Sequence, residues 1–268
     1  MRYAALLWLS SLTLPAQFAW RDAGPGRLEL IEKGRPVMVF NYGPQLAPGV
    51  AEDRRRCCYI HPYYSPSGVV LTDDFPKDHL HHRGIFWAWP QVILDGNTLD
   101  GWMMKGLEVR HERFLEKKPT LLKVENGWYA GEKKIVTETV VITPGPNHSF
   151  ALAVTLEALD KPVTLGGSRE AGKGYGGVSV RFAPRENTVI RTSEGAIVKD
   201  EDLNPHLMAE LEADYRGNKS RLRITATEPL PWCLRFYGFL GPSWPAQAKA
   251  TLEPHKPVTL RYRFESFD

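Results

Sequence analysis

Cysteine is scarce, with three in 268 residues. Cys57 and Cys58 are adjacent and Cys233 stands alone, so the sequence has neither a disulfide framework nor the CxxC spacing of a zinc site. One bridge from Cys233 to Cys57 or Cys58 is compatible with this arrangement and would leave one thiol over. Structural thiols are the interpretation we favour.

Long apolar runs and strong net charge are also missing. Charged residues, Gly or Pro interrupt every later apolar run well before the roughly 20 residues that cross a bilayer, so we expect no stable membrane span. The formal net charge of +3 is small and dispersed, which argues against a nucleic-acid partner. The densest basic run, residues 54–56, adjoins Glu52 and Asp53 and is typical of a solvated loop.

The first 16 residues have the pattern of a secretory signal peptide. Arg2 supplies the positive end, residues 4–14 form a short apolar segment, and Ala16 closes a small-residue cleavage site. The apolar segment is too short to span a bilayer, although a retained N-terminal anchor is the alternative. We therefore expect a mature chain of residues 17–268 in the periplasm or outside the cell.

The remaining chain is dominated by strand patterns. Residues 27–32 and 36–40 flank a Lys-Gly turn, and two longer alternating segments flank residues 144–147. The one helical candidate is residues 204–214, and neither a βαβ pattern nor a phosphate-binding loop occurs. We predict an all-β fold, a large antiparallel β-sandwich with few short helices, as a single domain over 17–268.

The residues of greatest chemical interest are clustered at positions 78–84, Asp-His-Leu-His-His-Arg-Gly. In extended backbone His79 and His81 would point the same way, whereas in a helical turn His79 and His82 would share a face. His61 lies upstream in a segment that Pro62 and Pro66 break, so we expect it and the cluster on loops over the sheet.

Three roles are open for the cluster. The three imidazoles could hold a divalent metal together with Asp73, Asp74 or Asp78. One imidazole could instead be a general acid or base that Asp78 orients, with His61 and Arg83 contacting substrate. The third role is purely structural, in which these side chains brace the loop by hydrogen bonding.

A glycine-rich segment, residues 166–177, is the second candidate ligand-binding region. It holds six glycines, which permit close backbone approach, and it leads into a predicted strand. Lys173 and Tyr175 are candidate substrate contacts, and Arg181 on the following strand could line a cleft. A structural loop and an exposed arginine are the alternatives.

The third region is residues 231–238, with Trp232, Phe236 and Tyr237 around Arg235. Aromatic rings there, and Trp87, Trp89 and Trp102, could stack on sugar rings, although core packing is the more common use of tryptophan in a sandwich. Arg235 is a further candidate substrate contact. No Gly-x-Ser-x-Gly motif supports a serine nucleophile.

Residues 59–89, 174–183 and 235–238 together resemble a bacterial family catalogued as methane oxygenase PmoA. The resemblance covers most of the mature chain and implies a secreted protein with a sugar-related role. Members often carry a His-Pro-x-Asn-like segment before the final motif, but residues 225–232 contain no histidine. That departure puts a complete site in doubt.

We therefore expect a secreted enzyme of the lyase or hydrolase kind that acts on a sugar or oxidised sugar. His79, His81 and His82, with Asp78, would carry the acid/base chemistry on a small-molecule or glycan substrate. A non-catalytic sugar-binding module and a metal-dependent oxygenase are the alternatives.

Overall fold

A computed structural model describes residues 17–268, so the predicted signal peptide lies outside the described residues. The elements are β1 (Phe18–Asp22), β2 (Arg27–Glu32), β3 (Arg35–Asn41), η1 (Glu52–Arg54), β4 (Tyr59–Tyr63), β5 (Ile85–Ala88), β6 (Gln91–Leu94), β7 (Asn97–Leu99), β8 (Glu108–Lys118), β9 (Leu121–Ala130), β10 (Lys133–Gly145), β11 (Ser149–Ala158), β12 (Val163–Gly166), η2 (Glu170–Gly172), β13 (Gly177–Arg181), β14 (Glu186–Thr192), β15 (Gly195–Ala196), β16 (Glu201–Tyr215), β17 (Asn218–Arg235), β18 (Phe239–Pro242), β19 (Lys249–Leu252) and β20 (Val258–Phe267).

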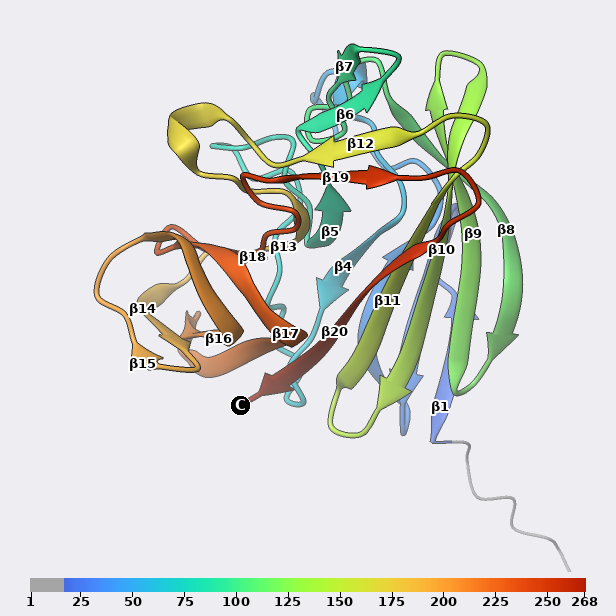
Figure 1. The fold of residues 1–268 in the computed structure, drawn as a ribbon. Coiled ribbons are helices and arrows are strands. Elements are labelled where there is room, and N and C mark those ends of the chain that lie inside the picture. Colours follow the sequence, from blue (N-terminus) through green and yellow to red (C-terminus); the bar gives the residue numbers. More distant parts are fainter. Residues whose placement is uncertain (1–16) are drawn as a thin grey trace, which may run out of the picture.

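The strands form two antiparallel sheets, which confirms the all-β, sandwich-like prediction. The larger sheet runs β1-β2-β3-β4-β5-β13-β18-β17-β20-β11-β10-β9-β8, and its end strands β1 and β8 approach each other, so the sheet curls almost closed. Strands β14, β15 and β16 extend it to one side (orange in Figure 1). The smaller sheet, β19-β12-β6-β7, crosses one end of the curled sheet (Figure 1).

Alternation along the strands fills the interior of the curled sheet. In β20, Leu260, Tyr262 and Phe264 are buried while Arg261 and Arg263 are exposed, as the sequence pattern predicts. Strand β11 packs beside β20 and contributes a matching apolar face. This core supports the loops that carry the polar clusters.

The predicted helix at residues 204–214 is wrong, because this segment lies within β16. Its helix-favouring residues are outweighed by pairing with β14 on one side and β17 on the other. Ala209, Leu211, Ala213 and Tyr215 are buried at every second position. The alternation that tertiary pairing requires therefore overrides local propensity.

The considered bridge to Cys233 does not form, since all three cysteines are free and buried. The sulfurs of Cys57 and Cys58 lie 2.8 Å apart, and the Cys57 thiol also contacts the carbonyl of Val109. The interpretation as structural thiols fits Cys57 and Cys58. Cys233 lies in a different apolar cluster, together with Trp102 and Phe239.

Candidate functional site

The histidine cluster lies on the connection between β4 and β5, where the chain forms consecutive turns. The amide of His79 bonds to Pro76 O and the amide of His82 bonds to His79 O. The helical-turn alternative therefore holds: the rings of His79 and His82 stack with centroids 4.6 Å apart and planes 10° apart. Gly84 ends the cluster, and a Cβ there would lie 2.3 Å from Ile60 O, so only glycine fits.

All three histidines line one cavity of about 410 Å³. His82 is 3% exposed at its base, His81 is half-buried, and the more open His79 ring stacks between His82 and Tyr237. Beneath them lies a separate apolar cluster formed by Tyr59, Phe86, Ala88, Trp102, Cys233 and Phe239. A cavity of this size suits a small ligand or one unit of a larger ligand.

Asp78 is placed to act on His79. One carboxylate oxygen lies 3.0 Å from His79 Nδ1, and Arg181 donates to both oxygens at 2.7 and 2.8 Å. Partial burial acts to raise the pKa of Asp78, but the hydrogen bonds from Arg181 and His79 outweigh it and lower that pKa to about 2. Asp78 is therefore a fixed negative charge beside the imidazole.

Two of the histidines are held neutral. Burial, followed by repulsion from His79, lowers the pKa of His81 to about 4. Burial, followed by repulsion from His81, lowers the pKa of His82 to about 2. Within residues 17–268 we find no protein hydrogen bond to either ring nitrogen of His81, so this neutral imidazole is free to accept a proton from a ligand.

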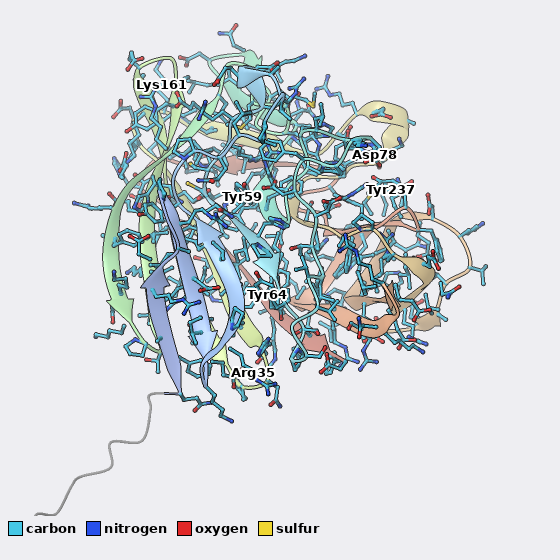
Figure 2. All side chains as sticks on the ribbon, turned by 180° about the vertical axis from the view of Figure 1, so that it is seen from behind. Arg35, Tyr59, Tyr64, Asp78, Lys161 and Tyr237 are labelled. Atoms are coloured by element: carbon cyan, nitrogen blue, oxygen red, sulfur yellow. The ribbon has the colours of Figure 1, made fainter. Side chains whose placement is uncertain are left out.

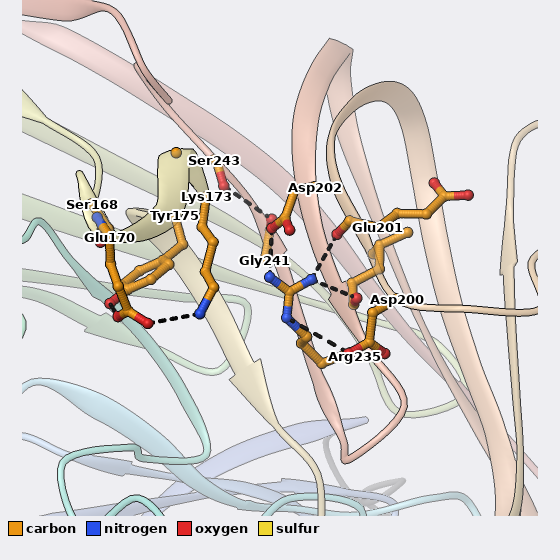
Figure 3. A network of polar contacts seen from close by, with 12 residues as sticks. Ser168, Glu170, Lys173, Tyr175, Asp200, Glu201, Asp202, Arg235, Gly241 and Ser243 are labelled. Atoms are coloured by element: carbon orange, nitrogen blue, oxygen red, sulfur yellow. Dashed lines mark hydrogen bonds and ion pairs between the residues drawn. The ribbon is translucent and has the colours of Figure 1, made fainter.

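The opposite wall comes from the glycine-rich loop between β12 and β13 (Figure 3). Lys173 Nζ donates to Glu170 Oε1 at 2.8 Å, and the Tyr175 hydroxyl donates to Glu170 Oε2 at 3.3 Å. The Tyr175 ring lies against Trp102, with centroids 4.9 Å apart. This wall therefore offers a carboxylate, an ammonium group and an aromatic face to one ligand.

Arg235 completes the lining, but its donors are largely engaged. It bonds to Asp202 at 2.5 Å and to the carbonyls of Glu201 and Leu234 (Figure 3). The side chain is 7% exposed. Arg235 therefore shapes the cavity wall more than it offers free hydrogen bonds.

Three predicted contacts lie elsewhere. Arg83 is 1% exposed and donates to the carbonyls of Leu80, His82 and Arg54, so it braces the histidine loop instead of contacting substrate. Arg181 is outside this cavity and holds Asp78. His61 lines a different cavity.

The structure also adds residues that sequence reasoning did not single out as ligand contacts. Glu170 and Ser168 belong to the glycine-rich loop, and Asp100 lies on the β7–Trp102 turn, where its Oδ1 accepts the amides of Trp102 and Met103 at 2.9 Å. The Asp-Gly-Trp sequence at 100–102 indicates a turn. The sequence could not show that this turn lies beside the histidines.

Metal binding by the cluster stays a prediction with little geometric support. Across residues 17–268 no group of three or more His, Cys, Asp or Glu side chains is arranged to hold a metal ion. Asp74, one of the suggested ligands, accepts a hydrogen bond from the Tyr59 hydroxyl at 2.8 Å and lies outside the histidine cavity.

Within residues 17–268 no helix has the length and apolar character needed to cross a membrane.

Comparison with known families decides the relationship. A model described as a family of unknown function (DUF6807) matches residues 27–268. The chain belongs to the DUF6807 family. The resemblance to methane oxygenase PmoA is therefore wrong, and no oxygenase activity follows from it. No curated protein matches this DUF6807 chain.

Several solved structures are similar in part to this DUF6807 protein. A GalM/aldose epimerase homologue from C. elegans is 8% identical, with a TM-score of 0.43 over 93% of this chain and 98% of that one. A galactose mutarotase related enzyme from Lactobacillus acidophilus is 8% identical, with a TM-score of 0.45 over 94% and 97%. Heparan sulfate lyase HepC from Pedobacter heparinus is 8% identical, with a TM-score of 0.39 over 90% of this chain and 33% of its own.

Proposed function

We propose that the histidine cavity binds a sugar or oxidised sugar and moves a proton on it. The observation that carries this proposal is the convergence of a neutral His81, an Asp78-oriented His79 and aromatic faces on one cavity. The half-buried Tyr175 ring can pack on the apolar face of a sugar, and Glu170 and Lys173 can bond to its hydroxyls.

The proposed division of labour follows from the environment of each imidazole. His81, which burial keeps neutral, accepts a proton from the substrate. His79 returns a proton to the substrate, and the carboxylate of Asp78, 3.0 Å from His79 Nδ1, orients the ring for this transfer. Arg181 acts through Asp78 and is a positioning residue.

The location is part of the proposal. The signal pattern of residues 1–16 supports delivery to the periplasm or beyond, where glycans are accessible.

The reaction class that we expect is a lyase or hydrolase reaction, because both need proton transfer to or from oxygen or carbon.

The test uses the purified protein in D2O with a panel of neutral monosaccharides, disaccharides and uronates. Saturation-transfer NMR reports binding, and the same spectra report anomer exchange, deuterium incorporation at carbon, and bond cleavage. We expect at least one sugar to bind and to undergo one of these proton-dependent changes faster than in buffer. Binding without any such change would identify a sugar-binding module instead, and no binding across the panel would contradict the proposal.

Arg181→Gln tests the positioning role. Without the guanidinium the pKa of Asp78 should rise from about 2 towards its ordinary value, because its strongest favourable partner is lost. The turnover rate should fall about 10-fold to 100-fold through misorientation of His79. Carbon-13 NMR titration of the Asp78 carboxyl gives the pKa, with Arg263→Gln, an exposed arginine in β20, as the matched control.

An unchanged Asp78 titration in Arg181→Gln would contradict this role. A slower enzyme with an unmoved carboxyl pKa would mean that Arg181 supports the fold alone.

A further inference from the structure

A second cavity of about 610 Å³ remains unused by the proposed reaction. It lies where β4, the 67–73 loop and the turn between β16 and β17 meet. Its polar lining includes His61, Thr72 and Asp73, and its apolar lining includes Val69, Ala183 and Pro184. This mixture of polar groups and apolar surface resembles that of the histidine cavity.

His61 presents a ring nitrogen to this second cavity. Its Nδ1 lies 3.0 Å from Thr72 Oγ1, which also accepts the amide of Tyr63 at 3.1 Å. Burial, followed by repulsion from Arg27, lowers the pKa of His61 to about 4, so the ring is neutral near pH 7. With the Thr72 hydroxyl donating to Nδ1, we assign the ring hydrogen to Nε2, which has no protein partner among the described residues.

Asp73 supplies an acceptor in the same cavity. Its Oδ1 accepts the amide of Asp74 at 2.9 Å, which leaves Oδ2 for a ligand. The side chain is half-buried. Together, His61 and Asp73 offer one donor and one acceptor, the pair that a sugar hydroxyl can use at once.

A third hollow of about 350 Å³ shares lining residues with each of the two cavities. Tyr237 lines both this hollow and the histidine cavity, while Asp73 and Pro184 line both the hollow and the second cavity. Figure 2 shows Asp78 and Tyr237 on the same side of the molecule, and Arg181 contacts both of them. We infer from these shared residues that the three spaces lie next to one another.

The middle hollow contains an unsatisfied group. Arg181 is 6% exposed, and its Nε and Nη1 have no hydrogen-bond partner, because only Nη2 bonds to Asp78. Buried guanidinium donors without partners are costly, and because both nitrogens are shielded from solvent they are not available to a ligand in the hollow. His79 stacks on the Tyr237 ring and the Arg181 guanidinium lies 4.9 Å from its centroid, so a ligand here meets only the part of Tyr237 that these groups leave exposed.

We propose that the substrate is an oligosaccharide, with its reacting unit in the histidine cavity, its next unit beside Tyr237 and Arg181, and a remote unit against His61 and Asp73. This inference rests on the proposed function and extends it from a single sugar to a chain. The two larger cavities each offer an apolar surface with a few donors and acceptors, and the third hollow shares Tyr237 with one of them and Asp73 with the other.

The test measures affinity against chain length. Probes are cello-, malto-, xylo- and oligogalacturonate series from one to six units, titrated by calorimetry into the full-length protein. For the linkage that binds, affinity should rise about 10-fold or more from one unit to the length that reaches the second cavity, and then level off. His61→Gln and Asp73→Asn should each remove about 10-fold for the long probes and nothing for the single unit.

Matched controls are His255→Gln and Asp95→Asn, an exposed histidine and an exposed aspartate away from these cavities. Equal affinity for short and long probes, or a long-probe affinity that neither His61→Gln nor Asp73→Asn changes, would overturn this inference and leave the proposed function standing. Absence of binding at every length would overturn both.

Discussion

Replacing His81 with glutamine is expected to lower turnover of the bound sugar by about 10²-fold to 10⁴-fold, the usual contribution of a general base. His81 lines the cavity, is neutral near pH 7 and makes no hydrogen bond that the fold needs within the described residues. Glutamine keeps a polar side chain of similar reach but cannot take the proton. The melting temperature should therefore stay within a few degrees of that of the unchanged protein.

The matched control is His255→Gln, which replaces an exposed histidine outside the cavity and should leave the rate unchanged. His82 is a poorer probe, because it is 3% exposed and packs against Phe86, Trp102 and Phe239, so its loss affects stability as well. A His81→Gln protein that folds and turns over at the original rate would contradict the assignment of His81 as the base.

The second large effect is a loss of stability in acid that the buried histidines cause. The pKa of His82 is about 2 in the folded protein and near 6.5 in the unfolded chain, so the unfolded chain binds the proton first. The stabilising contribution of His82 is therefore complete above pH 6.5 and is lost as the pH falls. His61, with a folded pKa of about 4, acts in the same direction.

His82→Phe isolates this effect, because the aromatic neighbours of His82 can accommodate a phenyl ring. As the pH falls from 6.5 to 4.5 the unchanged protein should lose unfolding free energy relative to the variant, at a rate that rises to about 1.4 kcal/mol per pH unit. Burial raises the pKa of Asp74 to about 6, so Asp74 makes the protein more stable as the pH falls. Both proteins contain Asp74, so its effect cancels in the difference between their unfolding free energies. Denaturant unfolding at several pH values measures the difference, and parallel pH curves would show that His82 is not held neutral.

The strands were predictable because side-chain alternation is a local property. The opening hairpin and the alternation of β20 follow from a period of two and a turn at Lys33-Gly34. Residues 204–214 of β16 were predicted as a helix instead, because their buried face is set by β14 and β17, which pair with β16 only in the folded protein. Propensity could not reveal those neighbours.

The site was predictable in part for a similar reason. Three histidines within four residues had to lie close together, and their backbone turn decided which rings stack. The same spacing could not show that Arg83 points inward to brace the loop, or that Arg181, about 100 residues away, holds Asp78. Glu170 and Trp102 join the histidines only because the β12–β13 loop and the turn after β7 meet over β18. Long-range pairing of strands therefore assembles most of the cavity.

The most direct test of the account is a nitrogen-15 NMR titration of the histidine side chains with the sugar that binds. Ligand contact in the cavity predicts that the ring signals of His79 and His81 shift in proportion to occupancy, while that of His255 stays in place. Saturable sugar binding that leaves the His79 and His81 signals unmoved would contradict the claim that these imidazoles face the substrate.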